Sequence, residues 1–267
     1  MHTMNNTRPT ALITGASGGL GFDLAELLAK DGHNLILVAR SASKLQNAAN
    51  TLSKKHGIKV ETISQDLSQV GAGQQLVHTL NSKGLQVDVL VNNAGFASYG
   101  RFIDLLLSEQ LNMIDLNVRA LVELTGLLTP GMVKRGKGRV LNIASTAAFL
   151  PGPLMAIYYA TKAFVLSFGE AISNELEGTG VTVTTFCPGG FASGFQERAA
   201  MQDSKLIQGK KLISSAEVAQ YGYNAMLKGE TVAIQGMGNY LTVQAPRFLP
   251  RRVVARMVRS AQERHPA

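Results

Sequence analysis

Short runs of apolar residues alternate along the chain with longer segments in which apolar residues recur every three or four positions. Short apolar runs bounded by turn residues are typical of buried strands, and the longer period is typical of amphipathic helices. The runs predict strands at residues 10–14, 34–39, 59–64, 87–92, 138–144, 181–187 and 231–234. The periodic segments predict helices at residues 19–30, 43–56, 74–82, 108–129, 157–177 and 215–228.

Strands that alternate with helices at this spacing predict an α/β fold, with a parallel sheet covered by helices on both faces. Neither a linker, a composition break nor an internal repeat divides the sequence, so we interpret residues 1–267 as a single domain. Residues 189–214 are mixed in composition and irregular in pattern. A connection of this length is typical of a mobile flap over a substrate site.

Composition agrees with a compact globular protein. The chain has 267 residues and is 45% hydrophobic, which is enough for one sizeable core. Its single cysteine, Cys187, excludes an internal disulfide framework and is compatible with a reducing compartment. Residues 1–9 are polar and lack the apolar core of a signal peptide. We therefore expect a cytoplasmic protein.

One uncharged segment is long enough to cross a bilayer. Residues 140–161 contain no charged side chain, but Pro151, Gly152 and Pro153 interrupt them. The polar groups of the segment would lack hydrogen-bond partners in lipid. A buried strand, a loop and the start of a helix fit the pattern better, and we expect no membrane-spanning segment.

The formal net charge of +8 is concentrated near the end of the chain. Residues 247–264 hold six arginines interleaved with apolar residues, which predicts a basic amphipathic helix. Such a helix could lie on an anionic membrane surface. It could instead pack its apolar face on the body or on another subunit and leave its basic face in water. We favour packing over membrane contact, and we expect no nucleic-acid partner.

A glycine-rich segment, Thr14 to Gly21, joins the first predicted strand to the first helix. A strand-to-helix turn of this kind lets the backbone approach a pyrophosphate, whose negative charge the helix N-terminus stabilises. A tight turn without a ligand is the alternative, but the position after the first strand favours cofactor binding. The turn residues expected to contact the cofactor are Gly15, Ser17, Gly19, Leu20 and Gly21.

Tyr158 and Lys162 are four residues apart in a predicted helix, which places a phenol and an ammonium one turn apart on the same face. A phenol with a pKa of about 10 is a poor proton donor or acceptor at neutral pH. A fixed positive charge lowers that pKa and makes the group useful in general acid–base catalysis. The same spacing is common on helix surfaces, so its weight depends on the other motifs.

Taken together, the motifs resemble the classical short-chain dehydrogenases/reductases, whose signature T-G-x-x-x-G-x-G matches Thr14–Gly21. The resemblance implies a Rossmann-type, doubly wound parallel sheet of about seven strands. Further elements follow in the family's order across nearly the whole chain: Asp66-Leu67, Asn92-Asn93-Ala94-Gly95, Asn117, Ser145, Tyr158 with Lys162, Pro188-Gly189, and Ser193.

The resemblance implies roles for these residues. Tyr158 would exchange a proton with the substrate oxygen, Ser145 would orient that oxygen, and Lys162 would lower the pKa of the tyrosine. Asn117 would hold a water molecule in a proton relay that leads from Lys162. Tyr159, without a lysine four residues later, would contribute packing. Cofactor contacts beyond the glycine turn are implied for Asp66, Leu67, Asn93, Ala94, Gly95, Tyr158, Lys162, Pro188, Gly189 and Ser193.

The end of the second predicted strand bears on cofactor choice. Folds that prefer NAD commonly carry a carboxylate there, which binds the ribose hydroxyls. Here the strand ends in Ala39-Arg40-Ser41, and a guanidinium suits a 2′-phosphate through charge-assisted hydrogen bonds. Arg40 therefore predicts a preference for NADP(H) over NAD(H).

The resulting prediction is an NADPH-dependent oxidoreductase that interconverts a carbonyl and a secondary alcohol, of ketone, aldehyde or 3-oxoacyl type. Apolar residues in loops 94–102 and 147–157 and in the flap after Pro188 suggest an apolar substrate, and a core role for several of them is equally compatible with the pattern. The resemblance also implies a homodimer or homotetramer. The five histidines are scattered without ligand spacing, so no metal site is expected. Alternatives are a non-catalytic NADP(H)-binding regulator and a membrane-peripheral reductase of lipid or acyl substrates.

Overall fold

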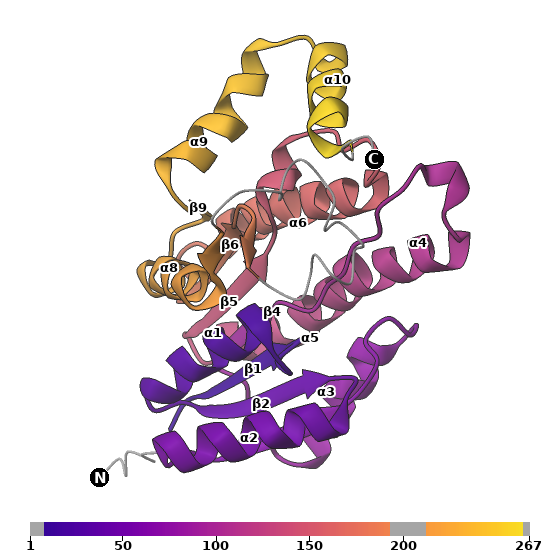
Figure 1. Ribbon diagram of the computed structural model, residues 1–267. Helices are drawn as coiled ribbons and strands as arrows, with labels where there is room; N and C mark the ends of the chain where they lie inside the picture. Colours follow the sequence, from indigo (N-terminus) through magenta and orange to yellow (C-terminus); the bar gives the residue numbers. More distant parts are fainter. Residues whose placement is uncertain (1–7, 193–211, 264–267) are drawn as a thin grey trace.

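A seven-stranded parallel sheet forms the centre of the computed structural model, which describes residues 8–192 and 212–263 (Figure 1). The strands follow the order β3-β2-β1-β4-β5-β6-β9, so the predicted doubly wound α/β fold is confirmed. Their bounds lie within two residues of the predicted ones: β1 Thr10–Thr14, β2 Asn34–Ala39, β3 Val60–Ser64, β4 Val89–Asn92, β5 Gly138–Ile143, β6 Val181–Cys187 and β9 Val232–Ile234.

Helices cover both faces of the sheet because successive strand residues point to opposite sides. Ala11 and Ile13 of β1 pack with α1 Gly19–Lys30, α2 Ala42–His56 and α8 Ser215–Lys228. Leu12, between them in sequence, packs on the opposite face with α3 Ala72–Ser82 and α5 Ala120–Lys134, where α6 Ala156–Glu175 also contributes. The buried apolar runs thus supply two separate cores, one on each face.

The helix predicted at residues 108–129 is wrong in two respects. The structure divides it into α4 Leu107–Ile114, a π-helical turn η2 Asp115–Arg119, and α5, which continues through Pro130 to Lys134. Proline normally ends a helix because its ring displaces the carbonyl four residues earlier and removes a hydrogen bond. Here Pro130 and the residue four before it, Gly126, are both exposed, so water can bind the freed carbonyl.

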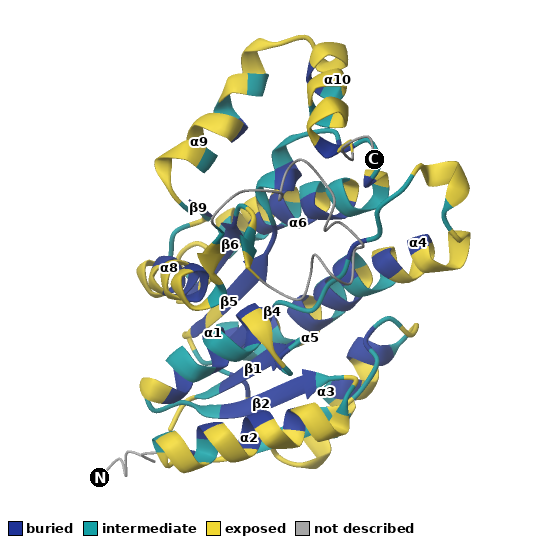
Figure 2. Ribbon diagram, viewed as in Figure 1, coloured by how far each residue is buried: buried dark blue, intermediate teal, exposed yellow. Residues whose placement is uncertain are grey.

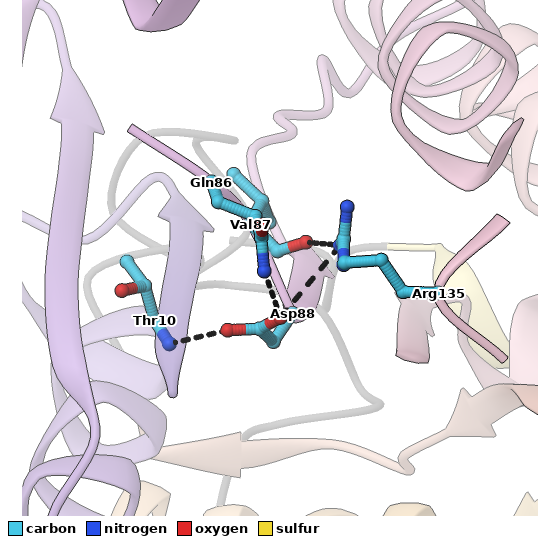
Figure 3. Close-up of polar contacts among 5 residues, drawn as sticks. All are labelled: Thr10, Gln86, Val87, Asp88 and Arg135. Carbon is cyan, nitrogen blue, oxygen red and sulfur yellow. Dashed lines mark hydrogen bonds and ion pairs between the residues drawn. The ribbon is translucent and has the colours of Figure 1, made fainter. Parts of the chain in front are cut away.

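One carboxylate, Asp88, connects several segments of the chain at the edge of the sheet where the strands begin (Figure 3). Its oxygens accept hydrogen bonds from the backbone N–H of Thr10 at 3.0 Å and from the Gln86 side chain at 3.0 Å. Arg135, just after α5, lies 3.6 Å from the carboxylate and donates to the Val87 carbonyl at 2.6 Å. Asp88 therefore ties the starts of β1 and β4 to the end of α5.

Residues 237–263 form a C-terminal arm that stands off from the β9 side of the sheet, away from β2 and α2 (Figure 1). The arm consists of α9 Met237–Gln244, a 3-10 turn η4 Ala245–Phe248, and α10 Arg251–Gln262. The predicted amphipathic helix at 247–264 is thus shorter and begins after a separate turn. Much of the arm is exposed, as Figure 2 shows, while Val243, Val254 and Gln262 are buried.

Within the described residues no helix is both long and apolar enough to cross a membrane. Residues 140–161 instead form part of β5, the 3-10 turn η3 Thr146–Phe149, a loop, and the start of α6, as expected. Most of the flap predicted at 189–214 lies outside the described residues. Its described ends include the short strands β7 Phe191–Ala192 and β8 Ile213–Ser214, which pair in parallel.

Candidate active site

The carboxyl ends of the parallel strands meet at the edge of the sheet opposite Asp88. β1 pairs with β2 on one side and with β4 on the other, so the chain changes direction across the sheet at β1. Such a switch leaves a crevice beyond the strand ends, where ligands bind in folds of this type. The predicted site residues converge on this crevice.

The glycine turn between β1 and α1 has the shape of a cradle. Gly15 adopts a φ of +69°, which L side chains rarely adopt, and a Cβ on Gly21 would overlap the Gly15 carbonyl oxygen. By contrast, a Cβ at Gly18 or Gly19 would enter open space. The turn is therefore tight on its inner side and open on the side where a pyrophosphate would lie, at the N-terminus of α1.

A second loop, Asn93 to Gly95, fixes the inner side of that turn. The Thr14 hydroxyl accepts from the backbone N–H groups of Asn93 and Ala94, each at 3.0 Å. The Asn93 side chain donates to the Thr14 carbonyl at 2.9 Å and to the Gly15 carbonyl at 3.3 Å. The side-chain amide of Asn93 thus stabilises the glycine turn, whereas Ala94 and Gly95 border the crevice.

The residues predicted to contact the adenosine end lie beside this turn. The Gly15 N–H donates to the Val38 carbonyl of β2 at 2.8 Å, which holds the turn against the strand that precedes Arg40. Arg40 is exposed and Ser17 is half-buried. Asp66 accepts from the Ser68 N–H at 3.0 Å and so supports a local turn after β3; Leu67, the next residue, is buried.

Ser145 and Tyr158 meet at the end of β5. Ser145 follows β5, and its hydroxyl accepts from the Ala147 N–H at 3.1 Å, which begins η3. Tyr158 lies in the first turn of α6, and the two hydroxyl groups share a hydrogen bond. Burial raises the pKa of Tyr158, and the hydrogen bond with Ser145 opposes that rise. The phenol is therefore held in its protonated, proton-donating form.

Lys162 lies one helical turn after Tyr158, and its ammonium is 5.8 Å from the centre of the tyrosine ring. It donates to the Ile143 carbonyl at 2.7 Å and is only 6% exposed. Burial lowers the pKa of Lys162 to about 8. Burial is the largest influence on both groups and raises the pKa of Tyr158, so the lowering of that pKa by Lys162 stays a prediction.

Asn117 is buried in the π-helical turn, a feature that often marks functional sites. Its amide donates to the Phe96 carbonyl at 3.0 Å and to the Thr161 hydroxyl at 3.1 Å, and its oxygen accepts from the Phe96 N–H at 3.1 Å. A Cβ on Gly95 would approach the Asn117 oxygen to 3.0 Å and the Lys162 ammonium to 3.7 Å. Asn117 thus positions the crevice loop beside Lys162, and the water relay stays a prediction.

Tyr159 packs edge to face with Tyr158, with the ring centres 6.1 Å apart, and its hydroxyl contacts the C-terminal arm, which the sequence did not indicate. Its hydroxyl accepts from the Gln262 side chain at 2.6 Å, and the Tyr99 hydroxyl donates to the Gln262 carbonyl at 2.6 Å. Gln262 is fully buried. No local pattern could reveal these contacts, since Gln262 is 103 residues from Tyr159 and 163 from Tyr99.

Pro188 and Gly189 close the crevice after β6. The Pro188 carbonyl accepts from the Thr146 N–H at 2.9 Å, next to Ser145. A Cβ on Gly189 would overlap the Asn239 side chain of α9 at about 2.5 Å, so the arm approaches this loop closely. Ser193, predicted to contact the cofactor, lies outside the described residues.

The site is built from hydroxyl, amide and ammonium groups. Among the described residues no group of three or more histidine, cysteine or acidic side chains could hold a metal ion. Cys187 is buried at the end of β6, and burial raises the pKa of its thiol to about 12. The chemistry available at this edge is therefore proton transfer and orientation of a polar ligand.

Comparison with known proteins shows which family and which enzymes this chain is similar to. A family model described as short chain dehydrogenase matches residues 9–204. The very-long-chain 3-oxoacyl-CoA reductase of Rattus norvegicus is 36% identical over 182 residues, which make up 67% of this chain and 58% of that protein. The ketoacyl reductase HetN of Nostoc sp. is 38% identical over 183 residues, or 68% of this chain and 63% of that protein.

Among solved structures, a short-chain dehydrogenase from Sphingobium yanoikuyae in complex with NADPH superimposes with a TM-score of 0.80. It is 30% identical and the match covers 97% of this chain and 98% of that chain. The chain thus matches a solved enzyme along nearly its whole length, but the curated relatives over less than two thirds of theirs.

Proposed function

Because this chain belongs to the short-chain dehydrogenase family, we propose that it interconverts a carbonyl and a secondary alcohol with NADP(H) as its cofactor. The observation that carries the proposal is the Tyr158–Ser145 hydrogen bond at the edge of a glycine cradle, with Lys162 one turn away. When bound, the nicotinamide supplies or accepts the hydride.

In the reductive direction, Tyr158 donates the phenolic proton to the carbonyl oxygen of the substrate. Burial keeps the phenol protonated, and Ser145 holds the substrate oxygen within reach of it. As negative charge develops on the Tyr158 oxygen, the Lys162 ammonium stabilises that negative charge. The neutral phenol, before the transfer, gains little from the positive charge of Lys162. In the oxidative direction the same groups withdraw the proton from the alcohol.

The crevice has the features that a dinucleotide needs. The open space above Gly18 and Gly19 fits a pyrophosphate at the helix N-terminus. The exposed Arg40, just beyond β2, fits a 2′-phosphate and supports NADPH over NADH. The NADPH in the Sphingobium yanoikuyae enzyme, which matches nearly this whole chain, adds support.

For the substrate we propose a 3-oxoacyl thioester or a ketone of similar apolar character. Two curated relatives are named for 3-oxoacyl and ketoacyl reduction. Beside Tyr158, the buried side chains of Ala97 and Met155 pack with the half-buried Tyr99 and Tyr159. The loops that carry these residues are joined by the Gly100 N–H, which donates to the Leu154 carbonyl at 2.8 Å. An apolar wall next to the proton donor suits an acyl chain.

A screen of NADPH oxidation over aldehydes, ketones and 3-oxoacyl thioesters of increasing chain length tests this function. We expect the highest kcat/KM for 3-oxoacyl thioesters, with the 3-hydroxy product identified by mass spectrometry. Tight NADPH binding without turnover of any carbonyl would contradict the enzymatic function and favour a regulatory protein. We further propose, on the family's pattern, a cytoplasmic homodimer or homotetramer, which light scattering would test.

A further inference from the structure

The outer face of the C-terminal arm exposes large apolar side chains in a number unusual for so short a segment. Phe248 is 88% exposed and Met237 is 72% exposed. The arm lies beyond residues 9–204, which match the family model. Its exposed apolar residues are Met237, Tyr240, Leu241, Phe248, Leu249, Val253 and Met257. An exposed apolar surface of this kind marks an interaction site.

The arm also carries a strong positive charge. Between Glu230 and Glu263 the sequence has no acidic residue, whereas it has five arginines: Arg247, Arg251, Arg252, Arg256 and Arg259. All five are exposed. Glu263, the last residue of the arm, pairs with Arg259 at 3.3 Å. The other four arginines, with no carboxylate between them in the sequence, repel a second copy of the arm and attract an anionic surface.

Helix α10 has one buried face and one exposed face. Val254 and Gln262, eight residues apart, are both buried, and Gln262 bonds Tyr159 and Tyr99 of the body. Val253 and Met257, four residues apart, form an exposed apolar stripe beside Arg252 and Arg256. The helix is therefore held to the protein by one face while it presents apolar and cationic groups on another.

A second exposed apolar patch shows what distinguishes the arm. The turn η1 Phe102–Asp104 and helix α4 expose Ile103, Leu107 and other apolar residues. There, however, Arg101 is paired with Asp104 at 3.5 Å, and Glu109 lies in the first turn of α4. The α4 patch has no excess of positive charge, so of these two patches the arm alone combines apolar exposure with a cationic surface.

We propose that the outer face of the C-terminal arm docks on the surface of an anionic lipid bilayer. Apolar side chains such as Phe248, Val253 and Met257 enter the boundary between headgroups and acyl chains, as in interfacial amphipathic helices. The arginines bind the lipid phosphates, with their aliphatic stems lying along the apolar surface. The arm lies on the membrane and does not span it.

Docking also bears on the candidate active site. The inner side of the arm contacts that site at two places, through Asn239 beside Gly189 and through Gln262 bound to Tyr159. A docked arm therefore places the apolar wall near Tyr158 close to the bilayer. The route of an apolar substrate from lipid to this wall rests on the proposed function, whereas the docking itself does not.

Flotation of the full chain with vesicles tests the proposal. We expect binding to phosphatidylcholine vesicles that contain phosphatidylserine, little binding to pure phosphatidylcholine, and weaker binding as salt is raised. Arg252→Gln/Arg256→Gln should lower the partition coefficient by about thirtyfold, since each arginine near an anionic surface adds roughly a fivefold gain. Val253→Ser/Met257→Ser should also reduce binding, most clearly at high salt.

Matched variants elsewhere provide the controls. Lys54→Gln/Lys137→Gln removes two exposed charges away from the arm, and Leu107→Ser/Leu111→Ser removes two exposed apolar residues of the α4 patch. Both should bind vesicles like the wild type. Equal losses in these controls, or no flotation of the wild type, would overturn the proposal. So would a dimer in solution that Val253→Ser/Met257→Ser converts to a monomer, because a second copy would then cover the face.

Failure of docking and failure of catalysis can be told apart. Thermal melting followed by circular dichroism checks that each arm variant is folded, whether or not a substrate is known. Turnover of a soluble carbonyl without vesicles should be equal in Arg252→Gln/Arg256→Gln and in the wild type. A chain that floats but turns over no carbonyl retains the docking proposal and loses the proposed function.

Discussion

The glycine turn and the C-terminal arm border the same crevice but are held in different ways. In the turn, backbone atoms leave no space: a Cβ on Gly21 would overlap the Gly15 carbonyl, and Thr14 and Asn93 bond the surrounding backbone. In the arm, a few buried side chains such as Gln262 make the attachment, and most of the surface is exposed. Backbone shape thus defines the cofactor side, and individual side chains define the substrate side.

This difference explains why the glycine turn can be predicted from the sequence and the attachment of the arm cannot. A turn whose shape depends on missing side chains must have glycine at fixed positions, and that requirement is visible as a motif. An attachment through one glutamine can be built by many residues at many positions. The adjacent tyrosines at the start of α6 link the two regions, since Tyr158 bonds Ser145 and Tyr159 bonds Gln262.

The largest expected effect separates these two tyrosines. Tyr158→Phe should lower kcat by about three orders of magnitude, because it removes the proton donor. NADPH affinity, measured by fluorescence titration, should change little. Tyr159→Phe removes only the hydroxyl that accepts from Gln262, so kcat should fall no more than severalfold. Comparable losses of kcat in both variants would reject the separation of roles.

Two alanine substitutions test the glycine turn. Gly21→Ala should destabilise the fold by about 1–3 kcal/mol and abolish NADPH binding, because its Cβ collides with backbone. Gly18→Ala places a methyl group in open space at an extended backbone position. It should leave the melting temperature unchanged and still weaken NADPH binding. If Gly18→Ala binds NADPH as the wild type does, the open space is not the pyrophosphate site.

Arg40→Gln tests the choice of cofactor. It should lower kcat/KM for NADPH by about tenfold to a hundredfold, which is the usual contribution of a charge-assisted hydrogen bond. The value for NADH should stay the same and serves as the internal control. An equal decrease for both cofactors would show that Arg40 acts on the fold and not on the 2′-phosphate.

Lys162, one helical turn after Tyr158, gives a pH-dependent prediction. Its pKa is about 8 in the folded chain and 10.5 when unperturbed, so between these values the unfolded chain binds more protons. The burial of the charged lysine therefore costs stability at pH 8, and this cost is relieved as pH rises toward 10.5. Relative to Lys162→Met, the wild type should gain stability over this range in urea unfolding. Parallel curves for the two proteins would contradict the lowered pKa.

The smallest expected effect concerns the attachment of the arm. Gln262→Met keeps the side-chain volume but removes the donor to Tyr159, at a cost of about 1 kcal/mol. Hydrogen exchange should accelerate in residues 251–262, and KM for an apolar substrate should rise severalfold while kcat changes little. Unchanged exchange in α10 would show that Val254 and other apolar contacts suffice to hold the arm.

The sequence predicted the sheet within two residues at each strand end because buried parallel strands need continuous apolar runs, as in β2. It also predicted that Ser145, Tyr158 and Lys162 lie together at one edge of the sheet. It missed the continuation of α5 through Pro130, since that depends on which face of the helix meets water. It could not show the burial that raises the pKa of Tyr158, because burial is a property of the packed chain and not of a four-residue spacing.

The Asp88 carboxylate at the amino edge has a practical consequence for immobilisation. Because it fixes the backbone N–H of Thr10, the chain enters β1 at the edge opposite the crevice, and the arm stands at the far end of the molecule (Figure 1). A tag joined before this strand would hold the protein by that edge. On a biosensor surface, the arm and the crevice would then face the flowing solution, open to vesicles, cofactor and substrate.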